Sequence, residues 1–115
     1  MTLLDIKNLL NANVLWGEEY MDQEIQSACG CDMMSDVLAF GSNHSILLTG
    51  LVNQQAIRTA EMMDMLCVVF VRGKEPNEAI LELAAEKHIV VMNTAYRMFL
   101  ACGLLYEAGL SEEGF

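Results

Sequence analysis

The chain has 115 residues, of which 54% are hydrophobic and 19% charged, and its 16 acidic against 6 basic side chains give a net charge of −10. This length and composition predict one globular domain spanning residues 1–115. The acidic balance disfavours nucleic acid and anionic membrane surfaces as partners, because both bind clustered lysine and arginine. The sequence shows no basic secretory start and no uninterrupted apolar span, so we expect a cytoplasmic protein with reduced thiols.

The first third of the chain predicts a helix, a strand and a second extended segment. Residues 2–10 (TLLDIKNLL) have the pattern of an amphipathic helix with Thr2 as its cap. Residues 13–17 (NVLWG) predict a brief strand. An acidic loop over 18–28 then runs into an extended segment around Ile25.

The stretch CGCDMMSD, residues 29–36, predicts a turn that opens a helix over 33–40. Gly30 permits an unusual backbone angle, and Asp32 is placed to accept hydrogen bonds from the first helical amides. Asp36, one turn further on, is expected to face water.

Three strand-then-helix units follow. Each strand is a continuous apolar run, and each helix shows apolar residues at helical spacing. Pro76 is expected in the first turn of the middle helix. The strands are predicted over 44–50, 66–71 and 89–92, and the helices over 53–65, 77–88 and 94–110. This alternation predicts an α/β fold, with a small, mostly parallel β-sheet flanked by helices on both faces.

The last predicted helix carries no charge between Met98 and Tyr106, so apolar groups occupy nearly all of its circumference. A surface helix normally keeps a polar face. The helix is therefore either buried on both sides by its own domain or in contact with a second subunit. The apolar share of the chain favours a homodimer. The candidate interface residues are Met98, Phe99, Cys102, Leu105 and Tyr106.

A loop with two of the six basic residues follows the strongest strand, and polar residues end the neighbouring strands. Ligands of parallel α/β sheets bind at the carboxyl ends of the strands. These positions predict a site for a small anionic ligand, although the loop lacks a phosphate-binding motif and a merely solvated loop is the simpler interpretation. The candidate residues are Thr49, Gly50, Asn53, Arg72, Gly73, Lys74, Asn93 and Thr94.

Catalytic and metal-binding patterns are missing from the sequence. Cys29 and Cys31 form a C-x-C pair, which matches neither the paired spacing of a zinc site nor the C-x-x-C redox motif, so packing is favoured over metal. No nucleophile elbow is present, and neither histidine has a sequence cue that pairs it with a nucleophile. We therefore expect no enzyme activity, no catalytic residues, no cofactor and no metal.

Residues 14–40 (VLWGEEYMDQEIQSACGCDMMSDVLAF) resemble the DRTGG domain family. The matching features are a strand that ends in Gly-Glu, an acidic segment, a small-residue turn and an Asp-x-x-Ser-Asp-Val helix start. They fall on Gly17, Glu18, Asp22, Glu24, Ile25, Gly30, Asp32, Ser35, Asp36 and Val37. Residues 67–96 are similar to the family's closing half, so the resemblance covers about 10–110. The chain departs from the motif at Gln23, Ser27 and Ala28.

The resemblance implies a regulatory or dimerising α/β module of the kind found beside CBS pairs in some pyrophosphatases. Stand-alone members tend to accompany hydrogenase-type redox proteins and sensor kinases, which makes such a protein the implied partner. The leading hypothesis is a non-enzymatic homodimer that regulates or assembles a partner protein. The alternatives are a sensor of a nucleotide or phosphorylated metabolite at the strand ends, and a metal or redox protein that uses Cys29 and Cys31.

Overall fold

The computed structural model describes residues 1–112 as five helices, a 3₁₀ turn and five strands. The strands are β1 (Asn13–Trp16), β2 (Ser27–Gly30), β3 (Ser45–Thr49), β4 (Cys67–Phe70) and β5 (Val90–Asn93). The helices are α1 (Leu3–Leu10), α2 (Met34–Phe40), α3 (Gln54–Met62), α4 (Glu78–Lys87) and α5 (Met98–Glu107), and the 3₁₀ turn η1 is Glu18–Tyr20.

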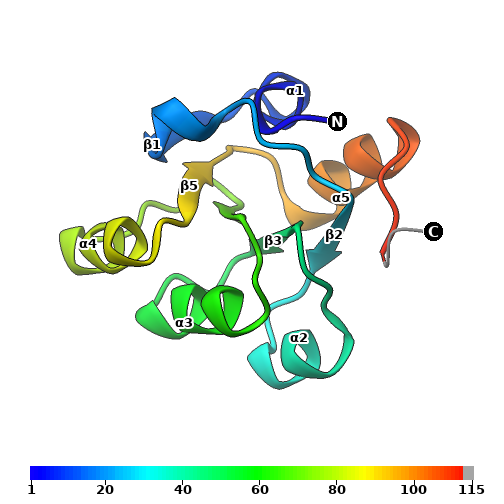
Figure 1. The fold of residues 1–115 in the computed structure, drawn as a ribbon. Coiled ribbons are helices and arrows are strands. Elements are labelled where there is room, and N and C mark those ends of the chain that lie inside the picture. Colours follow the sequence, from blue (N-terminus) through cyan, green and yellow to red (C-terminus); the bar gives the residue numbers. More distant parts are fainter. Residues whose placement is uncertain (113–115) are drawn as a thin grey trace.

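The five strands form one sheet in the order β1-β5-β4-β3-β2. The pairs β2–β3, β3–β4 and β4–β5 are parallel, and β1 joins β5 antiparallel. Helices α1 and α5 cover one face of the sheet, and α2, α3 and α4 cover the other (Figure 1). The predicted α/β fold with a mostly parallel sheet and helices on both faces is therefore confirmed.

Strand alternation divides the buried residues into two cores. In β4, Cys67 and Val69 face α1 and α5, whereas Val68 and Phe70 face α3 and α4. All four residues of β4 are buried, as expected for a central parallel strand covered on both faces. The apolar run predicted as the strongest strand thus lies in the middle of the domain.

Side-chain caps explain where several helices begin. Thr2 and Asp5 form a reciprocal capping box at α1, with Asp5 N donating to Thr2 Oγ1 at 3.2 Å and Thr2 N donating to Asp5 Oδ2 at 2.9 Å. Asn53 and Asn77 accept hydrogen bonds from the third amides of α3 and α4. Pro76 therefore precedes the N-cap residue of α4. The prediction that it lies in the first turn of this helix was wrong.

Two predicted boundaries were wrong in ways that matter for the site. The extended segment predicted around Ile25 forms its strand at Ser27–Gly30, because these residues pair in parallel register with β3. The helix predicted over 94–110 begins at Met98 and ends at Glu107, since residues 94–97 remain in a loop after β5. No helix within residues 1–112 is long and apolar enough to cross a membrane.

Candidate functional site

The strand-end residues singled out in the sequence do come together, because β3, β4 and β5 are parallel neighbours. Lys74 Nζ donates to the Gly50 carbonyl at 2.9 Å, which links the loops after β4 and β3. The amide of Gly73 donates to the Thr94 carbonyl at 2.8 Å, which links the loops after β4 and β5. The three loops thus form one hydrogen-bonded surface.

Several of the polar side chains at this surface are engaged by the protein itself. Asn53 caps α3, and Asn93 donates through Nδ2 to the Lys74 carbonyl at 3.2 Å. Thr94 Oγ1 donates to the buried carbonyl of Leu10 at 2.7 Å. These side chains hold the loops in place, as does Lys74 through its hydrogen bond to Gly50, and the Arg72 guanidinium is left to meet a ligand.

Asp32 is central to this surface, in a role that the sequence did not predict. It does not cap α2, whose N-cap is Met33 and has no side-chain capping bond. Asp32 Oδ1 instead accepts from the Gly50 amide at 2.7 Å and from Thr49 Oγ1 at 3.1 Å. The helix-capping prediction was wrong because the end of the parallel strand β3 presents its own donors to this carboxylate.

Gly30 also serves a purpose other than the expected one. It lies in strand β2 and is not among the residues with positive φ, so the predicted turn is wrong. A Cβ at this position would lie 2.5 Å from Cys102 Sγ and 3.3 Å from Met98 Sδ. Glycine is therefore needed to let α5 pack closely against β2.

We expect Gly30→Ala to lower the free energy of unfolding by about 1–3 kcal/mol, the usual cost of overpacking. Cys102→Ala removes the sulfur that the new methyl group meets, so the same change made in a Cys102→Ala background should cost less. Urea denaturation of the four proteins measures this coupling. Equal costs in the two backgrounds would contradict the packing of α5 on β2.

Two arginines face a common cavity beside the strand ends. We call it the arginine cavity; it is open to solvent and has a volume of about 390 Å³. It is lined by Gly30, Cys31, Asp32, Val71, Arg72, Arg97, Met98 and Phe99. Sequence reasoning missed Arg97, which occupies the N-cap position of α5 without a side-chain capping bond and was assigned to the interior of a longer helix.

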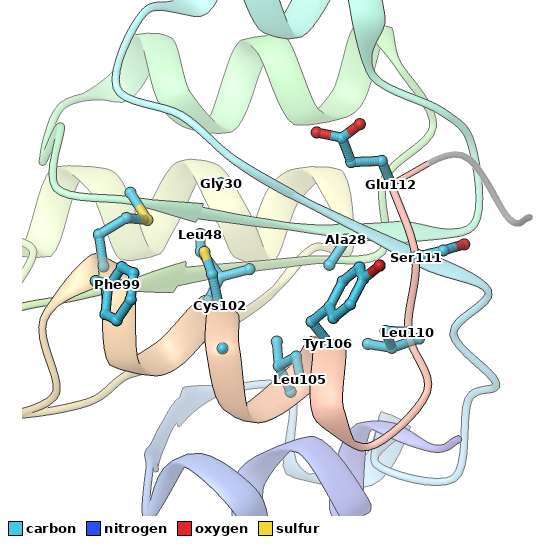
Figure 2. Close-up of a pocket in the computed structure, with 12 residues that line it drawn as sticks. Ala28, Gly30, Leu48, Phe99, Cys102, Leu105, Tyr106, Leu110, Ser111 and Glu112 are labelled. Carbon is cyan, nitrogen blue, oxygen red and sulfur yellow. The ribbon is translucent and has the colours of Figure 1, made fainter.

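A larger apolar groove of about 940 Å³ lies between α5 and the edge strand β2 (Figure 2). Its lining is Ala28, Gly30, Leu48, Met98, Phe99, Cys102, Gly103, Leu105, Tyr106, Leu110, Ser111 and Glu112. All five candidate interface residues line this groove. Phe99 and Tyr106 are 91% and 76% exposed, Met98 and Cys102 are half-buried, and Leu105 belongs to the core beneath.

The residues that match the DRTGG motif in the sequence do not form a single site. Asp22, Ser35 and Asp36 are exposed, and Glu24 forms an ion pair with the amino group of Met1 at 3.0 Å. Of the motif residues, Asp32 and Gly30 line the arginine cavity.

The cysteine pair is placed for packing. Cys29 and Cys31 are partly buried against the core shared with α2. Burial, more than the neighbouring Cys31, raises the pKa of Cys29 to about 11, which keeps it a thiol at neutral pH. Within residues 1–112, no cluster of three or more His, Cys, Asp or Glu side chains is placed to hold a metal ion.

No protein-family model matches this sequence, and no curated protein matches it. Among solved structures, the chain is similar to the CBS and DRTGG domains of the regulatory region of Clostridium perfringens pyrophosphatase, crystallised with its activator diadenosine tetraphosphate. The TM-score is 0.75 at 22% identity, and the match covers 90% of this chain and 45% of that one. The chain therefore has a DRTGG-like fold and spans about half the length of that regulatory region.

Proposed function

We propose that this chain is a regulatory or assembly module without catalysis of its own, and that it acts as a homodimer paired through α5. One observation carries the proposal: the apolar groove is lined by Phe99 and Tyr106, two aromatic side chains that are largely exposed. Aromatic residues around an apolar depression are typical of protein interfaces.

Charge favours a second copy as the occupant of this face. At a net charge of −10, two copies repel each other over most of their surfaces. The segment from Met98 to Tyr106 has no charged side chain, and Glu112 is the one charged residue among those that line the groove, so pairing there brings little like charge together. It also covers the aromatic rings that a monomer leaves in water.

A regulatory role is supported by the kind of structure that shares this fold. The similar domains belong to the regulatory region of a pyrophosphatase, where an activator nucleotide is bound. In this chain, the same architecture would act on a partner protein. The sequence resemblance implies that this partner is a redox protein or a sensor kinase.

Sedimentation equilibrium at micromolar chain concentration tests the pairing. We expect a dimer for the unchanged chain and at least a tenfold higher dissociation constant for Phe99→Glu and Tyr106→Glu, because buried aromatics act as interface hot spots worth about 2 kcal/mol or more. Met62→Glu is the matched control, since Met62 is 68% exposed on α3, across the sheet from α5. A monomeric parent chain, or equal weakening by Met62→Glu, would refute the proposal.

A further inference from the structure

Half of the basic side chains of this acidic chain lie at one end of the sheet. Arg72, Lys74 and Arg97, three of its six lysines and arginines, follow strands β4 and β5. None of the three forms an ion pair within residues 1–112. Positive charge without a carboxylate partner, at the carboxyl ends of parallel strands, is suited to an anionic ligand.

The backbone holds Arg72 in a conformation that arginine rarely adopts. Its φ is +64° and that of Gly73 is +68°, and their amides donate to the carbonyls of Tyr96 and Thr94 at 2.8 Å each. A Cβ on Gly50 would lie 2.5 Å from Arg72 Nη2, so the glycine leaves room for the guanidinium to lie across it. Such a left-handed arginine costs free energy and is typical of functional positions.

The arginine cavity offers three kinds of contact within about 390 Å³. The first is cationic: Arg72 and Arg97 line the cavity beside the amino-terminal turn of the ten-residue helix α5. The second is an acceptor, Asp32, whose Oδ1 is engaged by Thr49 and Gly50. Its other oxygen has no hydrogen-bond partner within residues 1–112 and can accept from a hydroxyl donor. The third is the exposed aromatic ring of Phe99.

We propose that the arginine cavity binds a nucleoside phosphate. The two guanidinium groups contact the phosphate oxygens, Asp32 accepts from the ribose hydroxyls, and the base stacks on Phe99. A bare anion such as inorganic phosphate is attracted by the two arginines but repelled by the Asp32 carboxylate. Tight binding therefore needs the added contacts of the ribose and the base. The cavity is complete within one chain, but Phe99 also lies on the proposed pairing face, so the base and a second chain compete for its ring.

Isothermal titration calorimetry of the full chain tests the site with AMP, CMP, adenosine and inorganic phosphate as probes. We expect both nucleotides to bind at least about tenfold more tightly than adenosine or phosphate, since each of the latter makes half of the contacts. Arg72→Gln and Arg97→Gln should each weaken nucleotide binding about tenfold or more. Gly50→Ala should do the same, because its methyl group displaces the Arg72 guanidinium.

Arg58→Gln is the matched control, because Arg58 is an exposed arginine on α3 outside the cavity. Its affinity for nucleotide should equal that of the parent chain, with circular dichroism confirming that every variant is folded. The proposal is overturned if no probe binds, if phosphate binds as tightly as the nucleotides, or if Arg58→Gln weakens binding as much as Arg97→Gln. Sedimentation of the same samples reports on pairing separately, so failure of one proposal is distinguishable from failure of the other.

Discussion

Replacing Phe70 with alanine is expected to lower the free energy of unfolding by about 3–5 kcal/mol. Within residues 1–112, Phe70 is the largest of the fully buried side chains, and it lies at the end of β4, in the core that α3 and α4 cover. Removing its ring loses buried apolar surface and leaves a cavity that the surrounding sheet and helices cannot fully close. A domain of this size has a total stability of about 5–15 kcal/mol, so the loss is a large part of it.

Urea denaturation at a fixed chain concentration measures this loss, because pairing would make stability depend on concentration. Phe40→Ala is the matched control: Phe40 is 69% exposed at the end of α2, so its loss should change stability by less than about 0.5 kcal/mol. Equal losses for the two variants would mean that β4 is not the centre of the domain.

Gly17→Ala is expected to cost about 2–4 kcal/mol, the second largest effect. Gly17 joins β1 to the 3₁₀ turn at a φ of +99°, a conformation that is strained for alanine. Its added Cβ would also lie 2.8 Å from Val90 Cγ2 and 3.3 Å from Val90 Cα. Neither atom moves easily, because Val90 is a buried, β-branched residue of β5.

Gly109→Ala separates the two causes. Gly109 has a φ of +113°, but no atom lies within 4 Å of the position of an added Cβ. Its cost should be that of backbone strain alone, about 1 kcal/mol. The difference between the two losses of unfolding free energy then measures the clash with Val90. Equal losses would show that Gly17 does not pack against Val90 as closely as the structure indicates.

Hydrophobic pattern was sufficient to predict most of the fold. Apolar runs form β3, β4 and β5, and amphipathic segments lie between them. This alternation is visible in the sequence and predicts the βαβ order. Segment β2 was misplaced because Ser27–Gly30 has no strand-forming residues of its own. It becomes a strand through pairing with β3, a long-range contact that sequence periodicity does not contain.

The candidate site was predicted in outline and missed in detail. Parallel strands bring their carboxyl ends together, which was enough to place Arg72 and Lys74 at one surface. Arg97 was missed because the helix boundary was set four residues too early; its position shortly after β5 was the available signal. The role of Asp32 depends on donors at Thr49 and Gly50, which no local pattern connects to it.

The pairing of two chains through α5 is tested most directly by hydrogen–deuterium exchange of the unchanged protein at high and low chain concentration. If α5 is the interface, peptides covering Met98–Tyr106 and β2 exchange more slowly at high concentration, whereas peptides covering α3 and α4 are unaffected. Exchange in α5 that is independent of concentration, or protection that appears on α3 and α4 instead, would contradict the account.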